Sequence, residues 1–147
     1  MSLAESKRVG ERAEATAIEL LPIKFVGDTT AEHYDAVVTE STDRLDHGDP
    51  IEIKSAAVVI SGERPGMWFL RRRQHEQLCE DDGWYLLVVC SPDPDRRILA
   101  HRFLDAEAVE ERLIPSWWSG PDSRSDFRQV RWTHVFDEGD LDAGGIR

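Results

Sequence analysis

The stretch PIEIKSA, residues 50–56, places an acid and a base two positions apart. A β-strand turns successive side chains to opposite faces, so Glu52 and Lys54 share one face. Ile51 and Ile53 then share the other face, and the segment continues into the apolar run AAVVI. Such a pair is either a solvated ladder of surface charge or part of a metal-dependent active site. The rest of the chain has to decide between these interpretations.

The elements that must position this pair can be predicted from hydrophobic periodicity and turn residues. In chain order they are a helix over 8–21, strands over 23–26, 33–40 and 51–60, an extended segment over 67–70, a helix over 71–82, a buried strand over 84–90, a helix over 104–114 and a last strand over 127–136. This order predicts an α/β fold with an αβββαβ core, in which helices flank a mixed central sheet.

The length of 147 residues predicts a single domain. We expect its core over about 8–103, a helix and strand extension over 104–136, and a flexible polar tail over 137–147.

The charge is strongly acidic, with 29 acidic against 18 basic residues and a net charge of −11. Three of the basic residues are lysine and the rest are arginine, while the acids are dispersed along the chain. Dispersed acid with few lysines predicts adaptation to molar salt, where repulsion between charges is screened. Since Arg71, Arg72 and Arg73 are clustered, the net charge does not exclude DNA as a partner.

Other classes of protein are disfavoured by the sequence. The chain has no run of eighteen apolar residues, and its first residues form no apolar signal segment. The two cysteines, Cys79 and Cys90, have no metal-ligand spacing, so we expect neither a disulfide framework nor a zinc knuckle. We therefore expect a cytoplasmic protein without a membrane partner.

Further residues able to do chemistry occur in a fixed order around Glu52 and Lys54. A G-x-x-x-E pattern joins Gly10 to Glu14 in the first helix, Asp35 stands in the apolar strand before IEIK, and Gln74 lies in the next helix. This ordered set resembles the PD-(D/E)xK nuclease superfamily with its restriction-endonuclease-like fold. The nearest patterns are those of archaeal Holliday-junction resolvases and small restriction-like domains, and we expect a haloarchaeal source.

The resemblance covers residues 8–90, and it departs from the family pattern in that no proline precedes Asp35. It implies a DNA endonuclease that uses Mg²⁺, or Mn²⁺, on branched or duplex DNA in recombination, repair or restriction. Phosphodiester hydrolysis requires charge neutralisation and an activated water, which a hard divalent ion with oxygen ligands provides.

The resemblance also assigns roles to individual residues. The implied metal ligands offer oxygen atoms and are Asp35, Glu52, the backbone carbonyl of Ile53, and Glu14 through a bound water or a second ion. Lys54 would orient or deprotonate the attacking water, or stabilise charge on the phosphate. Gln74 would position water or phosphate, and Arg71 to Arg73 would contact the DNA backbone.

Alternatives remain open at this point. The chain could be a catalytically inert or partner-dependent nucleic-acid-binding module of the same fold, although the joint presence of Glu14, Asp35 and Lys54 argues against inertness. A homodimer would suit two-fold symmetric branched DNA. We assign Trp117 and Trp118 to the core or to a dimer contact rather than to base stacking.

Overall fold

The computed structural model describes residues 19, 35–60, 64–91, 97–119 and 126–141, together with the backbone of 23–25. The predicted helix over 8–21 lies outside the described residues, apart from Glu19, which is helical.

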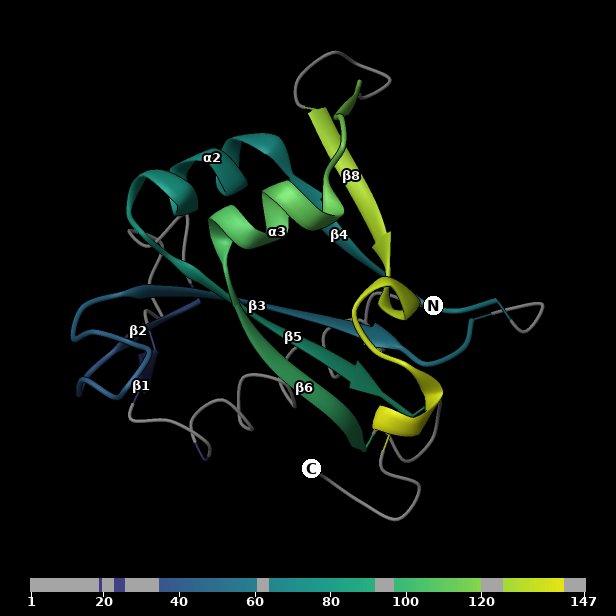
Figure 1. Cartoon of the computed structure of the whole chain (residues 1–147), viewed down its shortest axis with the longest axis horizontal. Helices are drawn as coiled ribbons and strands as arrows, with labels where there is room; N and C mark the ends of the chain where they lie inside the picture. The colour runs from purple at the N-terminus through teal and green to yellow at the C-terminus, as the bar shows by residue number, and fades with distance from the viewer. Residues whose placement is uncertain are drawn as a thin grey trace.

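A mixed sheet of five strands forms the centre of the molecule (Figure 1). In spatial order its strands are β1 (Ile23–Phe25), β2 (Ala36–Val38), β3 (Pro50–Ala57), β5 (Trp84–Cys90) and β6 (Ile98–Asp105). β3 and β5 run parallel, while the other neighbouring strands pair antiparallel. The α/β class and the mixed sheet are therefore confirmed, although β2 is shorter than predicted.

The alternation of side chains along β3 divides the core into two apolar clusters. Ile51 packs into the cluster on one face of the sheet, and Ala56 packs into the larger cluster on the other face. β5 contributes side chains to both clusters, which explains its unbroken apolar run. Glu52 and Lys54 have the same parity along the strand as Ala56, so they project to the face of the larger cluster.

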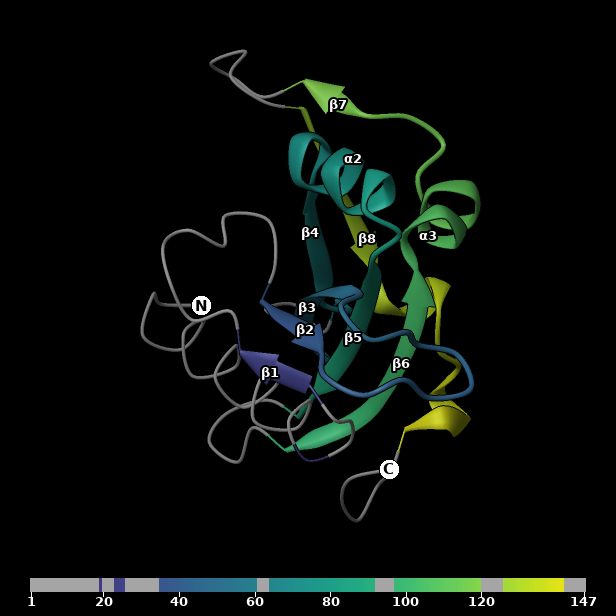
Figure 2. The same cartoon turned by 90° about the vertical axis from the view of Figure 1, so that its left-hand side faces the viewer.

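Two helices cover this larger cluster, α2 (Arg72–Glu80) and α3 (Ala106–Leu113) (Figure 2). Leu78 of α2 and Val109 of α3 are fully buried in it. Both helices were predicted, with slightly wider bounds. Neither described helix has the length and apolar content needed to cross a membrane.

The ends of these helices follow from local sequence. Asp105 caps α3, because its carboxylate accepts a hydrogen bond from the Ala108 N–H at 2.8 Å. After α2, Asp82 adopts a positive φ of 55°, and the Gly83 N–H donates to the Leu78 carbonyl at 2.7 Å. This tight ending turns the chain directly into β5.

A second sheet was not predicted as a separate unit. It consists of β4 (Met67–Arg71), β8 (Asp126–Arg131) and β7 (Trp118–Ser119), with β8 in the middle. Its inner face closes the larger cluster, and the buried Trp68 donates from its indole Nε1 to the Val88 carbonyl at 3.0 Å. The predicted extended segment before α2 is thus a strand, paired with residues far along the chain.

The predicted last strand is wrong in its second half. β8 ends at Arg131 and is followed by the 3₁₀ helix η2 (Trp132–His134). The Trp132 side chain is buried there, and its Nε1 donates to the Val58 carbonyl at 2.7 Å. Within the predicted tail, the 3₁₀ helix η3 spans Glu138–Asp140.

Candidate active site

The residue before β2 is held against β3 by two hydrogen bonds. The Asp35 N–H donates to the Ile51 carbonyl at 3.0 Å, and the Asp35 carboxylate accepts from the Ile53 N–H at 2.7 Å. These contacts flank Glu52 on both sides in the sequence. The Asp35 side chain, which is half-buried, is therefore fixed next to the position of Glu52.

Glu52 and Lys54 form an ion pair on one face of β3. The Lys54 Nζ lies 3.6 Å from a Glu52 carboxylate oxygen, and the two side chains are only 21% and 12% exposed, respectively. A pair of solvated surface charges requires exposed side chains. The interpretation of Glu52 and Lys54 as such a pair is therefore wrong. The structure brings Asp35, Glu52 and Lys54 together, while their roles at a metal site stay predictions.

The charged form of Glu52 is disfavoured by its surroundings in this site. Burial, and next the negative charge of Asp35, raise the pKa of Glu52 from 4.5 to about 8, although the Lys54 ammonium opposes this rise. The Asp35 carboxylate, bonded to the Ile53 N–H, lies next to Glu52 and adds a negative charge there. Two carboxyl groups are therefore held together at a position where a single lysine does not offset both charges.

A hard divalent ion fits this donor set. Carboxylate oxygens are the ligands that Mg²⁺ and Mn²⁺ prefer, and a doubly charged ion would offset the negative charges of Asp35 and Glu52. The N–H of Ile53 bonds Asp35. Ligation by the Ile53 carbonyl stays a prediction. Gly10 and Glu14 lie outside the described residues, so their predicted roles stay predictions too.

Gln74 lies in the first turn of α2 and is half-buried. The helix contacts β3, and among the described residues no hydrogen bond or ion pair joins Gln74 to Asp35, Glu52 or Lys54. The role of Gln74 at the site stays a prediction.

The three clustered arginines have different surroundings. Arg71, the last residue of β4, stacks its guanidinium over the Phe69 ring, with 5.3 Å between the guanidinium carbon and the ring centroid. Arg72 pairs with Asp126 at 2.8 Å and with Glu76 at 3.4 Å. Arg73 is exposed on α2. Since Arg72 has two acidic partners, the arginines do not act as one uniform basic patch.

An aromatic surface beside Arg71 was missed by the sequence reasoning. On the second sheet, the Phe69 and Phe127 rings stack at 5.2 Å, and Trp118 meets Phe127 edge-on at 5.7 Å. Phe69 and Trp118 are 39% and 41% exposed. Trp117 packs against the core as expected, whereas Trp118 belongs to this surface. The alternation in MWFLR hinted at one exposed aromatic residue, but the partner strands are too distant in sequence to infer the cluster.

Comparison with known proteins identifies the family of this chain. A family model described as the PD-(D/E)XK nuclease superfamily domain matches residues 1–137. No curated protein matches the sequence significantly.

Proposed function

Because the chain belongs to the PD-(D/E)XK nuclease superfamily, we propose that it is a DNA endonuclease that hydrolyses phosphodiester bonds with Mg²⁺ or Mn²⁺. Branched or duplex DNA is the proposed substrate, in recombination, repair or restriction. The single observation that carries this proposal is the cluster of Asp35, Glu52 and Lys54, in which a lysine lies 3.6 Å from the buried Glu52 carboxyl group, next to that of Asp35.

Each member of the cluster has a distinct proposed role. Asp35 and Glu52 would hold the ion, with Glu14 and the Ile53 carbonyl as further oxygen ligands. When bound, the ion offsets the negative charge of the phosphate and activates water. Lys54, held in place by Glu52, would orient or deprotonate the attacking water, or stabilise the charge that develops on the phosphate.

The DNA would approach along the start of α2. Gln74 would position water or a phosphate oxygen, while Arg71 and Arg73 would contact the DNA backbone. We expect a weaker contribution from Arg72, because Asp126 and Glu76 already offset its charge.

A partner-dependent or inert nucleic-acid-binding module of the same fold is the alternative. The complete set of Asp35, Glu52 and Lys54 favours the enzyme, since a module that only binds DNA does not need a buried glutamate beside a second carboxyl group. Both the enzyme and the binding module are compatible with a homodimer, or with a partner protein that supplies specificity. The resemblance to Holliday-junction resolvases makes a four-way junction the first substrate to try, and a cytoplasmic location remains our expectation.

The proposal is tested by incubating the purified chain with linear, flapped and four-way DNA, in Mg²⁺, in Mn²⁺ and in EDTA. We expect cleavage of at least one DNA structure with either ion and none in EDTA. Asp35→Asn and Glu52→Gln should each abolish cleavage, because each removes a charged ligand.

Glu111→Gln is the matched control, since it removes an exposed carboxylate from α3, away from the cluster. It should cleave like the wild type. Binding of DNA without cleavage in any ion would favour the non-catalytic alternative, and equal cleavage by Glu52→Gln would assign the activity to a contaminant.

A further inference from the structure

A second cluster of potential ligands lies between the two helices. His75 and Cys79 stand one turn apart on α2, and Glu110 faces them from α3. The His75 Nε2 lies 3.4 Å from the Cys79 sulfur and 3.4 Å from a Glu110 carboxylate oxygen. All three donor atoms lie within 4.8 Å of one another. No zinc spacing was visible in the sequence because the third residue comes from another helix.

These separations fit a tetrahedral metal ion. With metal–nitrogen and metal–oxygen bonds of about 2.0–2.1 Å and a metal–sulfur bond of about 2.3 Å, the edges of the tetrahedron are about 3.4–3.6 Å long. The nitrogen–sulfur and nitrogen–oxygen distances in this cluster already match such edges.

The orientation of the His75 imidazole is fixed by contacts of its other nitrogen, Nδ1, and of its ring. His75 is completely buried, and its Nδ1 lies 2.8 Å from the hydroxyl of the buried Tyr85. Trp117 packs against the same ring, with 5.5 Å between the centroids. Metal-binding histidines commonly donate their second ring N–H to such a neighbour, which turns the other nitrogen toward the ion. Here the Nε2 is turned toward Cys79 and Glu110.

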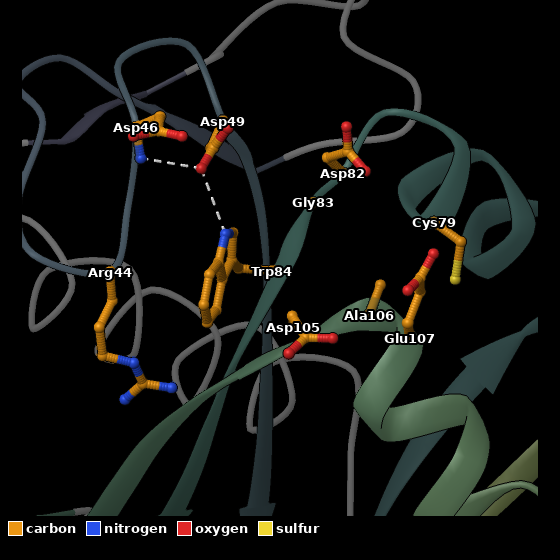
Figure 3. A pocket seen from close by; sticks show the side chains of 10 residues that line it. All are labelled: Arg44, Asp46, Asp49, Cys79, Asp82, Gly83, Trp84, Asp105, Ala106 and Glu107. Carbon is orange, nitrogen blue, oxygen red and sulfur yellow. Dashed lines mark hydrogen bonds between the residues drawn. The ribbon is translucent and has the colours of Figure 1, made fainter.

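The surroundings favour a cation and give it a route of entry. The charges of Glu76, Asp105, Glu107 and Glu110 all act on Cys79. Cys79 also lines a pocket of about 440 Å³, whose wall carries several carboxylates and a single arginine (Figure 3). An ion in this pocket would therefore meet negative charge before it reached the thiol.

We propose that His75, Cys79 and Glu110 bind one transition-metal ion of the Zn²⁺ class, with the fourth position open to water from the pocket. Sulfur and nitrogen ligands select such an ion over Mg²⁺, so this site is chemically distinct from the cluster of Asp35 and Glu52. The bound ion joins α2 to α3 and stabilises the layer that covers the larger core cluster. The site does not depend on the proposed nuclease function.

The test is a titration of the metal-free full-length chain with Co²⁺, in the presence of excess Mg²⁺ to occupy the oxygen-ligand site. We expect one Co²⁺ per chain, with the thiolate-to-cobalt absorption band and the visible bands of tetrahedral cobalt, and displacement by Zn²⁺. At a Zn²⁺ concentration a hundred times its Kd, the melting temperature should rise by roughly 5–10 °C.

Cys79→Ser should remove the thiolate band, and Glu110→Gln, at a half-exposed side chain, should weaken Zn²⁺ binding at least about tenfold. Glu111→Gln, its neighbour on α3, should bind Zn²⁺ like the wild type. A cobalt spectrum without the thiolate band, or the same band in Cys79→Ser, would overturn the proposal. Equal Zn²⁺ affinity in Glu110→Gln would overturn it as well.

Discussion

Glu52 is the side chain of the candidate active site whose pKa its neighbours and its burial change most. It is buried, adjoins the Asp35 carboxyl group, and contacts the Lys54 ammonium. Burial and Asp35 together outweigh Lys54, so the pKa of Glu52 rises to about 8 in the folded protein. A carboxyl group whose pKa is raised by folding favours the folded state while it is protonated.

This shift predicts how the stability of the metal-free protein changes with pH. The contribution of Glu52 is complete below pH 4.5 and is lost as the pH rises toward about 8. The loss should be on the order of 3–5 kcal/mol of unfolding free energy. In EDTA, Glu52→Gln should therefore flatten the decline between pH 5 and 8 that the wild type shows, as measured by urea unfolding at each pH. Mg²⁺ should restore stability at pH 8 to the wild type and much less to the variant.

The buried His75 and the half-buried His101 act in the opposite direction. Burial lowers the pKa of His75 and of His101, so their contribution falls as the pH drops below 6.5. They are the same in both proteins, so the difference between wild type and Glu52→Gln isolates the carboxyl group. Parallel pH profiles of the two proteins would contradict a raised pKa of Glu52.

At the scale of elements, the junction of β3 and β4 determines how the second sheet meets the first. The Gly66 N–H donates to the Ala57 carbonyl at 3.1 Å, and a β-carbon on Gly66 would lie 2.0 Å from that carbonyl oxygen. Gly66→Ala must therefore push two backbone segments apart.

We expect Gly66→Ala to lower the unfolding free energy by roughly 1–3 kcal/mol, measured by thermal or urea unfolding. Gly139→Ala is the matched control, because a β-carbon there has no atom within 4 Å. It should leave stability nearly unchanged. Equal stability of both variants would mean that the approach of β4 to β3 is not as tight as described.

The arginines at the start of α2 allow a second comparison of closely matched residues, here in their contribution to DNA binding. Replacing Arg71 and Arg73 by Gln should weaken DNA binding and reduce the slope of log K against log salt by about 0.9 for each lost phosphate contact. Arg72→Gln should change this slope less, because its charge is offset by Asp126 and Glu76. Fluorescence anisotropy in Ca²⁺, over a series of KCl concentrations, would measure both. A larger slope change for Arg72→Gln would contradict this assignment of the DNA path.

The elements differ in how much of them the sequence revealed. Period-two alternation in IEIK and the unbroken apolar run of β5 were enough to predict the strands and the shared face of Glu52 and Lys54. The second sheet was missed because β4 pairs with β8, about sixty residues further on, and local patterns carry no information on such pairing. The cluster of His75, Cys79 and Glu110 was missed for the same reason, since α2 and α3 meet only in the folded chain.

At the scale of the whole molecule, the net charge of −11 should make stability depend on salt. The Debye length falls from about 10 Å at 0.1 M to about 3 Å at 1 M salt, so repulsion between surface acids is screened. We expect the melting temperature in KCl to rise steadily from 0.1 M to 2 M. An unchanged or falling melting temperature would contradict the adaptation to molar salt that the composition predicts.

The most direct test of the central claim is the single-turnover rate of DNA cleavage by Lys54→Arg in Mg²⁺, with DNA affinity measured in Ca²⁺. Arginine keeps the positive charge, but its wider guanidinium cannot release a proton near neutral pH. We predict that the cleavage rate falls about 10²–10⁴-fold while DNA affinity stays close to that of the wild type. Cleavage at nearly the wild-type rate would contradict a catalytic role for Lys54 and, with it, the assignment of the cluster as the active site.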